Sequence, residues 1–129
     1  MRKISTGGFD FRMQEQEADK LQSHYKETIH YIAWEPSTGT VQNYIFDVDT
    51  TGNSVTDSFY KINFHNSLNG IPFFLADMQT TNGLDQANVR WRNKNTQSIQ
   101  VQIDEEQSSD SETKHVFETV GFIAVTPSN

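Results

Sequence analysis

The chain has 129 residues, enough for one domain whose hydrophobic core needs neither metal nor disulfide bonds. Its net charge of -7 argues against a nucleic-acid-binding protein, which needs a basic surface, and the absence of cysteine excludes disulfide scaffolds, thiol catalysis and zinc-thiolate sites. No apolar run approaches the roughly 18 residues of a membrane span and no signal-peptide segment follows Met1, so we expect no membrane insertion.

Short runs rich in Val, Ile, Thr, Phe and Tyr predict strands along the whole chain. In chain order they cover residues 9–14, 28–34, 41–48, 54–64, 71–78, 89–92, 99–103 and 116–125. The run at 71–78 is nearly continuously apolar, as expected for a strand buried on both faces. Residues 14–25 lack an apolar stripe and predict a strand end and an acidic loop rather than a helix.

Turn residues at 51–53, 69–70 and 82–83 separate several of these runs. Many short strands with regular turns are typical of a β-sandwich or β-barrel. We therefore expect an all-β fold, an antiparallel β-sandwich of about six or more strands. The residues expected in its core are Phe11, Ile32, Phe46, Ile62, Phe73, Leu75, Val101, Ile103, Phe122 and Ala124.

An internal repeat is the most informative feature of the sequence. Residues 9–15 align with 99–105 and residues 24–33 with 115–124, and Pro36 falls on Pro127. Both copies contain, in the same order, an alternating strand, an acidic loop, a His, a Glu-Thr pair, an aromatic-Ile-Ala run and a Pro. The repeat divides the chain into a partial unit at 1–39 and a complete β-sandwich unit at 40–129.

The partial unit lacks strands equivalent to residues 41–89, and two lone strands cannot bury a sheet face. Its two strands can pack onto the complete unit, or they can pair with another chain and so form a homo-oligomer. A third interpretation is that the chain is a fragment of a longer repeat protein, cut inside a repeat.

From residue 40 onward the chain resembles the H-type lectin group and its bacterial relatives, which are modules repeated near the ends of large bacterial cell-surface proteins. The motifs that carry the resemblance include Gly52-Asn-Ser-Val-Thr56, Ile71-Pro-Phe-Phe-Leu75, Ala87-Asn-Val-Arg-Trp-Arg-Asn93 and Glu118-Thr-Val-Gly-Phe-Ile-Ala124. The resemblance implies a compact antiparallel β-sandwich. H-type lectins bind sugars such as N-acetylgalactosamine, usually as trimers, at sites between protomers. This sequence departs from the H-type lectins at residues 104–112. Here an acidic loop replaces the loop before the last strand, which in the lectins helps to form the sugar site.

The candidate carbohydrate-binding residues are Asp85, Asn88, Arg90, Trp91 and Arg92. A strand places Arg90 and Arg92 on one face and Trp91 on the other. A planar aromatic side chain can stack on a sugar ring, and each arginine supplies five hydrogen-bond donors. In the alternative interpretation Trp91 belongs to the core and the arginines pair with carboxylates on a neighbouring strand.

Two other groups of polar residues each have a functional and a structural interpretation. The loop from Asp104 to Glu112 contains five acidic residues (Asp104, Glu105, Glu106, Asp110 and Glu112) that could hold calcium, or that form a solvated loop or pair with arginine. His24 with Glu27 and His115 with Glu118 suggest either a metal or acid–base pair, or a structural hydrogen bond where the loop enters the strand. Strand residues three apart face opposite ways, so we expect that one such pair cannot chelate.

Three aromatic residues, Trp34, Tyr44 and Tyr60, either form an exposed stacking platform, or belong to the core or cover a sheet face. The sequence has no nucleophile elbow, no phosphate loop and no metal-ligand spacing of histidines. We therefore expect no catalysis, no cofactor beyond the calcium candidate and no metal site elsewhere.

The expected function is that of a carbohydrate-binding or adhesion module of an extracellular bacterial protein, at the cell surface or secreted. The alternative is a structural or oligomerisation module without a small-molecule ligand. The expected partner is a carbohydrate, with no nucleic acid and no membrane.

Overall fold

The structure, a computed structural model, describes residues 2–19 and 25–128. These residues form nine strands in three antiparallel sheets and contain no helix, which confirms the all-β prediction. The strands are β1 (Arg2–Ser5), β2 (Gly8–Asp10), β3 (Ser37–Val41), β4 (Tyr44–Val55), β5 (Tyr60–Asn63), β6 (Phe73–Met78), β7 (Ala87–Arg92), β8 (Ser98–Glu105) and β9 (Glu118–Pro127).

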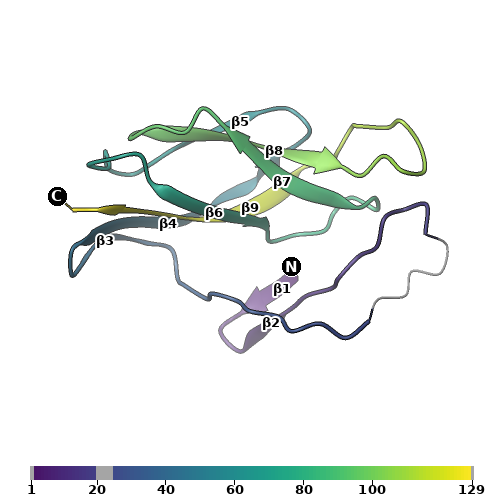
Figure 1. Cartoon of the computed structure of the whole chain (residues 1–129), viewed down its shortest axis with the longest axis horizontal. Helices are drawn as coiled ribbons and strands as arrows, with labels where there is room; N and C mark the ends of the chain where they lie inside the picture. Colours follow the sequence, from purple (N-terminus) through teal and green to yellow (C-terminus); the bar gives the residue numbers. More distant parts are fainter. Residues whose placement is uncertain (1, 20–24, 129) are drawn as a thin grey trace.

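Two of the sheets face each other and form a β-sandwich (Figure 1). One has four strands in the order β3-β4-β9-β6, and the other has three in the order β5-β8-β7. The two central strands, β8 and β9, bury alternate residues, since each is hydrogen-bonded on both sides and faces the other sheet. They supply most of the core, together with residues of β4, β5 and the loop after β5.

The core contains five of the ten expected residues, namely Ile62, Val101, Ile103, Phe122 and Ala124. Phe46 is half-buried. The expectation was wrong for Phe11, Ile32, Phe73 and Leu75, all of which are exposed. The first two of these lie outside the sandwich, and the other two lie on its outer surface.

Strand β6 is the clearest departure from the sequence pattern. Its side chains alternate between exposed and half-buried, so it is not buried on both faces as predicted. It pairs with β9 at the edge of the four-stranded sheet, and only its inner face, with Phe74, Ala76 and Met78, packs against the core. Phe73 and Leu75 point outward, which gives the outer face of this sheet an apolar surface.

Two predicted boundaries near β4 were also wrong. The run at 41–48 contains the β3–β4 hairpin, whose turn uses Gln42 in a left-handed conformation with φ of 52°. The Gly52 turn predicted at 51–53 is instead an irregularity within β4, where the register against β9 shifts between Thr50 and Asn53. Gly52 has φ of 64°, a conformation that favours glycine, so the strand bends here without ending.

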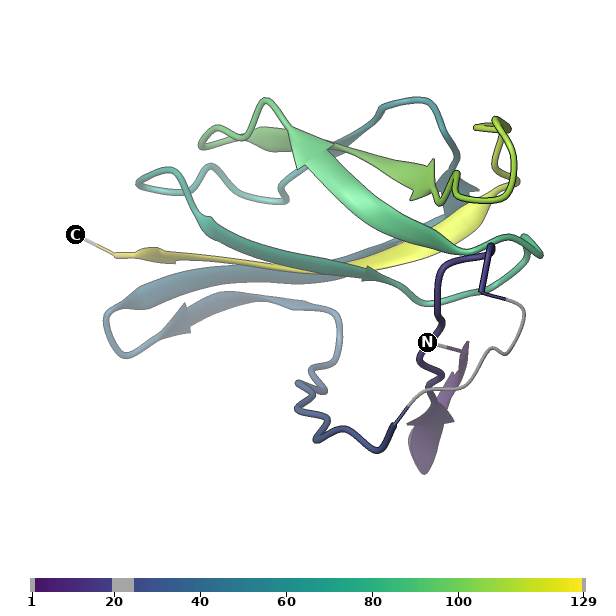
Figure 2. The same cartoon turned by 45° about the vertical axis from the view of Figure 1, so that its right-hand side comes forward.

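Residues 2–19 and 25–36, here called the N-terminal segment, lie beside the four-stranded sheet (Figures 1 and 2). A hairpin of β1 and β2 is its whole strand content in the described residues. The predicted strand at 28–34 is therefore wrong, and the one at 9–14 ends at Asp10. Strands need hydrogen-bonding partners, and both sides of β8 and β9 are already occupied.

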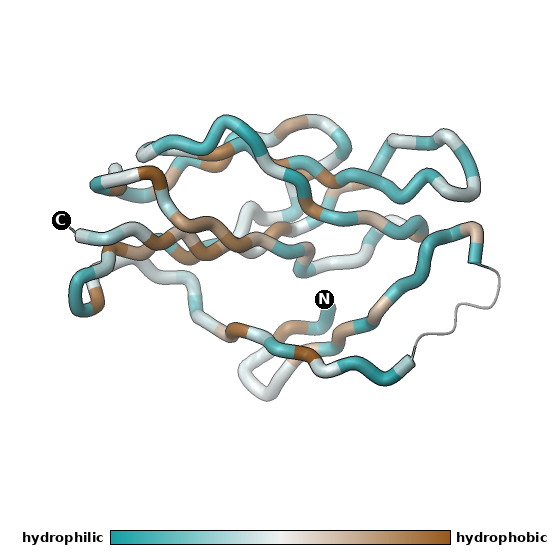
Figure 3. The backbone as a smooth tube through the Cα atoms, viewed as in Figure 1, coloured by the Kyte–Doolittle hydropathy of each residue, from teal (hydrophilic) through white to brown (hydrophobic). Residues whose placement is uncertain are grey.

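Several contacts join the N-terminal segment to the sandwich, among them a hydrogen bond of 2.9 Å from the Ala18 backbone N–H to Ser108 Oγ. The rings of Trp34 and Phe46 lie 4.8 Å apart. The Glu17 backbone N–H donates to Glu106 at 2.8 Å, and the Gln86 N–H donates to Glu17 at 3.2 Å. Figure 3 shows apolar residues in this segment as well as in the sandwich, and those of the segment stay largely exposed.

Candidate functional site

The outer face of the three-stranded sheet carries most of the candidate carbohydrate-binding residues. Strand β7 runs antiparallel to β8, so Asn88, Arg90 and Arg92 lie opposite Asp104, Gln102 and Gln100. Strand β5 adds Lys61 opposite Gln100. We call this surface the polar face, and its members are Lys61, Asn88, Arg90, Arg92, Gln100, Gln102 and Asp104.

Hydrogen bonds hold the two arginines of the polar face in place. Arg90 Nε donates to Asp104 Oδ2 at 3.0 Å, and Arg92 Nε donates to Gln100 Oε1 at 3.0 Å. The guanidinium carbon of Arg92 lies 3.5 Å from the ring centre of Phe59, a cation–π contact. The pairing of an arginine with a carboxylate across strands is thus present for Arg90, and the remaining N–H groups of both guanidiniums project from an exposed surface.

Trp91 lies on the opposite side of β7 from these arginines. It pairs with the buried Val101, and its ring is 6.3 Å from that of Phe74, which packs on the core. The side chain is 49% exposed at the rim of the sandwich, with Lys94 Nζ 4.8 Å from its ring centre. Trp91 therefore does not share a surface with Arg90 and Arg92.

The two other candidates differ in position. Asn88 lies on the polar face, in register with Asp104. Asp85 precedes β7 in an exposed loop. The structure therefore brings together Asn88, Arg90 and Arg92, but not all five predicted residues.

The carboxylates of the acidic loop contact different partners. Asp104 pairs with Arg90, and Glu105 lies against His115. Glu106 accepts hydrogen bonds from Ser108 and from the backbone N–H of Glu17, and these bonds lower the pKa of its carboxyl group. Within residues 2–19 and 25–128 no three His, Cys, Asp or Glu side chains converge in a way that could hold a metal ion. Calcium binding at this loop stays a prediction.

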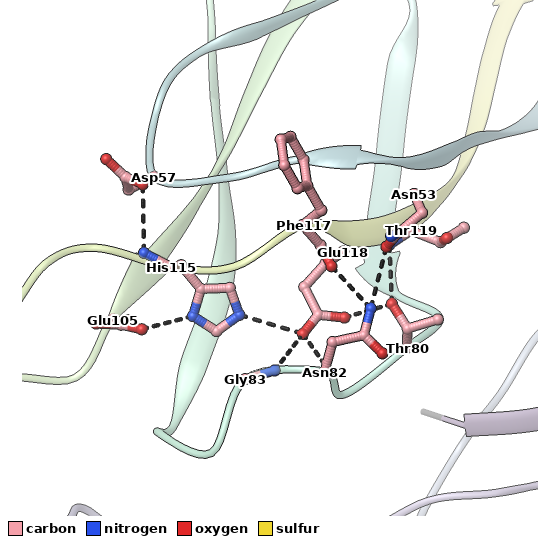
Figure 4. A network of polar contacts seen from close by, with 10 residues as sticks. All are labelled: Asn53, Asp57, Thr80, Asn82, Gly83, Glu105, His115, Phe117, Glu118 and Thr119. Atoms are coloured by element: carbon pink, nitrogen blue, oxygen red, sulfur yellow. Dashed lines mark hydrogen bonds and ion pairs between the residues drawn. The ribbon is translucent and has the colours of Figure 1, made fainter.

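The buried polar network of the sandwich centres on Glu105, His115 and Glu118, here called the buried triad (Figure 4). His115 Nδ1 lies 2.6 Å from Glu105 Oε1, and its Nε2 lies 3.2 Å from Glu118 Oε1. Each of the three side chains is at most 4% exposed. The predicted structural hydrogen bond between His115 and Glu118 is confirmed.

The expectation that His115 and Glu118 face opposite ways was wrong. Strand β9 begins at Glu118, so His115 lies in the preceding loop, where strand alternation does not apply. The loop also brings the backbone N–H of His115 to Asp57 Oδ1 at 3.2 Å. The equivalent pair is not comparable, because His24 lies outside the described residues.

Glu118 also fixes the loop between β6 and β7. Its Oε1 accepts the backbone N–H groups of Asn82 at 2.6 Å and Gly83 at 2.9 Å, and its other oxygen accepts the hydroxyl of Thr80. A side chain at Gly83 would overlap the ring of His115, so this close approach requires glycine. The triad thus ties three parts of the chain together and acts as a structural clamp.

A second polar cluster, which the sequence did not reveal, lies on β4 and the loop after β5. The His65 backbone N–H donates to the buried Asp47 at 2.6 Å, and its ring nitrogens lie 3.0 Å from Asp47 and 3.4 Å from Asp49. The hydrogen bond to Asp47, and then its negative charge, raise the pKa of His65. The Asp-x-Asp spacing placed both carboxylates on one face of β4, but nothing in the sequence pointed to their partner.

A groove lies between the N-terminal segment and the outer face of the four-stranded sheet. This groove has a volume of about 1180 Å³, and Phe11, Met13, Tyr31, Leu75 and Ile123 are among the residues that line it. One of its walls belongs to a segment without strand pairing beyond Asp10.

The tryptophan and tyrosines considered as a stacking platform do not share one surface. Trp34 contacts Phe46 on the outer face of the four-stranded sheet, and Tyr44 begins β4 in that sheet. Tyr60 begins β5 in the opposite sheet. In the described part of the chain, no helix is long and apolar enough to cross a membrane.

Comparison with known proteins relates the chain to a segment of a far longer one. It is similar to Halomucin of Haloquadratum walsbyi (strain DSM 16790 / HBSQ001), with 31% identity over 123 residues. The match covers 94% of this chain and 1% of Halomucin, so the chain spans about one hundredth of that protein's length. No family model and no solved structure matches the chain. The similarity makes the chain a module-sized relative of one stretch of a very large protein.

Proposed function

We propose that the chain is a non-catalytic module of a large cell-surface protein and that it binds carbohydrate on the polar face. The similarity of nearly the whole chain to one hundredth of Halomucin supports the first part, since it is what a single module of a long protein would give. The buried triad supports the absence of catalysis, because its ionisable groups are enclosed and serve as a clamp.

The observation that carries the carbohydrate proposal is the row of fixed donors and acceptors on the polar face. Arg90 and Arg92 lie one above the other on β7, each anchored through Nε, with amide groups of Gln100 and Gln102 beside them. Adjacent hydroxyl groups of a sugar are recognised by such pre-positioned polar groups. The sugar would lie flat on an open sheet, with Phe59 beneath Arg92 as the aromatic component.

A glycan array, run with calcium and again with a chelator, tests this proposal. Binding of a defined set of sugars by the chain should be lost in the Arg90→Ala/Arg92→Ala double variant. It should persist in Lys114→Ala, which removes an exposed positive charge outside the polar face. Loss of binding with the chelator would add a calcium site in the acidic loop.

A blank array in both conditions, on a folded sample, would reject the carbohydrate proposal. The second candidate, a structural or assembly module, would then stand. It is favoured by the apolar outer face of the four-stranded sheet, where Phe73 is 73% and Leu75 is 58% exposed. Large exposed apolar patches mark contact surfaces between proteins.

A further inference from the structure

The two copies of the internal repeat have the same residue pattern but opposite environments. Phe11 is 54% exposed, whereas the aligned Val101 is fully buried. Tyr31 is 68% exposed, whereas the aligned Phe122 is 5% exposed. One copy thus fills a core, while the other leaves most of the aligned positions exposed, with Phe9 half-buried and its ring 5.2 Å from that of Tyr31.

The correspondence extends over every core position of β8 and β9. Residues Phe9, Met13, Ile29 and Ala33 align with Ile99, Ile103, Val120 and Ala124, which are all at most 1% exposed. It also includes the polar positions, because Glu15 and Glu27 align with Glu105 and Glu118 of the buried triad. A carboxylate at a core position is costly without its partners, so the recurrence of both carboxylates fits a second clamp of the same kind.

The sandwich of this chain cannot accept the first copy. β9 lies between β4 and β6, and β8 lies between β5 and β7, so both positions are filled. The N-terminal segment accordingly has no strand pairing beyond Asp10, and it encloses the large groove rather than closing onto the sheet. The residues that would bury its apolar side chains must come from elsewhere.

We infer that the strand patterns at residues 9–15 and 25–33 form the closing strand pair of a second sandwich, and that their partner is the open half of a second unit of the same fold, one that lacks its own closing pair. The open half is the part before β8, residues 37–97, with strands β3 to β7. Its inner surface offers the apolar side chains of Val55, Ile62, Phe64 and Leu68 to a closing pair. Its backbone N–H groups at Asn82 and Gly83 donate to Glu118 here, and in the second unit they would donate to Glu27.

The repeat also fixes how the two parts connect. Gly8 aligns with Ser98, so an open half placed directly before Gly8 would connect to it as Gln97 connects to Ser98. An intact second sandwich cannot be the partner, since its own β8 and β9 already fill the central positions of its two sheets. The partner is therefore an open half joined to residue 8, and the inference does not depend on carbohydrate binding.

A fusion of residues 37–97 to residues 8–129 tests this inference by amide hydrogen exchange. Amides at 28–34 should exchange rapidly in the original chain. In the fusion they should become protected by at least about 100-fold, in a species that is monomeric by size. A tandem of residues 37–127 followed by 37–129 serves as the positive control, because both of its closing pairs are the authentic β8 and β9.

A substitution separates specific closure from general compaction. Tyr31→Asp should leave the melting temperature of the original chain unchanged, since Tyr31 is exposed there. In the fusion it should abolish protection at 28–34, while residues 119–126 stay protected and report that the second sandwich is folded. The inference is overturned if 28–34 exchange equally fast in the fusion and in the original chain. It is also overturned if the fusion fails to fold while the tandem control folds.

Discussion

At the scale of single residues, Glu118 shows how a charge can be built into a β-sandwich core. Its carboxylate has no exposed surface and accepts hydrogen bonds from two backbone N–H groups and a hydroxyl, beside the imidazole of His115. Desolvation of a carboxylate costs several kcal/mol, and only a full set of partners offsets it. Within the described residues no buried side-chain N or O atom lacks a partner, so the network is complete.

Glu118→Ala should therefore destabilise the fold by about 3–5 kcal/mol, because it leaves buried donors of the β6–β7 loop and of His115 without an acceptor. Urea unfolding measures the loss. Glu112→Ala, which removes an exposed carboxylate of the acidic loop, is the control and should change stability by less than about 0.5 kcal/mol. Equal stability of the two variants would show that the triad is not a clamp.

The pH dependence of stability should reveal the contact of His65 with Asp47. The raised pKa means that the folded state binds the proton of His65 more tightly than the unfolded state does. This stabilisation is fully present below the unfolded pKa, near 6.5, and is lost as the pH rises through the raised folded pKa. Because His65 is half-exposed, we expect a modest effect.

The measurement is the free energy of unfolding of the native chain and of His65→Gln, from about pH 5 to pH 9. Subtracting one from the other removes the titration of the other histidines. The advantage of the native chain should be largest at the acidic end and shrink toward the alkaline end. A difference that stays constant with pH, or grows, would contradict the assigned contact.

At the scale of elements, β6 separates two adjacent phenylalanines that the sequence does not distinguish. Phe74 points inward, with its ring 6.0 Å from Phe122 and 6.3 Å from Trp91, whereas Phe73 is 73% exposed on the outer face. Phe74→Ala should cost about 2 kcal/mol or more, because it leaves a cavity among aromatic rings. Phe73→Ala should change stability by less than about 0.5 kcal/mol in thermal unfolding. The reverse order would mean that the register of β6 is wrong.

Local patterns predicted the strands well where the two faces of a strand differ. The alternation of Ile99, Val101 and Ile103 with polar residues correctly placed β8, and all three are buried. The same alternation at 28–34 gave no strand, because a strand exists only with hydrogen-bonding partners, which a local pattern does not reveal. An apolar run such as 71–78 likewise does not reveal whether one or both faces of the strand are buried, and in β6 only one face packs against the core.

The candidate site was predictable to the extent that it lies on one strand. Strand periodicity correctly separated Arg90 and Arg92 from Trp91. The third member of the buried triad, Glu105, is ten residues from His115, and only the repeat of Glu15 in the first copy signalled it. Asp47 and His65 lie on different elements, so their contact depends on the folded loop after β5 and left no signal.

At the scale of the whole molecule, two stretches with nearly the same pattern should contribute very differently to stability. Residues 98–127 hold the centre of both sheets, whereas the N-terminal segment lies outside both sheets and contacts the sandwich through residues such as Glu17, Ala18 and Trp34. A chain of residues 37–129 should therefore remain folded, with a loss of no more than about 2 kcal/mol, on the order of one aromatic pair and a few exposed hydrogen bonds.

A chain that ends at Lys114 is the matched control, because it lacks His115 and all of β9, which belong to the second copy of the internal repeat. It should be unfolded by circular dichroism and amide exchange, since β4 and β6 lose the strand that joins them. Unfolding of the 37–129 chain would contradict the separation of segment and sandwich, and would make the N-terminal segment part of the same folding unit. If that chain stays folded while the chain ending at Lys114 does not, stability follows the partners of a strand rather than its sequence pattern. The first copy would then be a strand pair whose partners lie outside this sandwich.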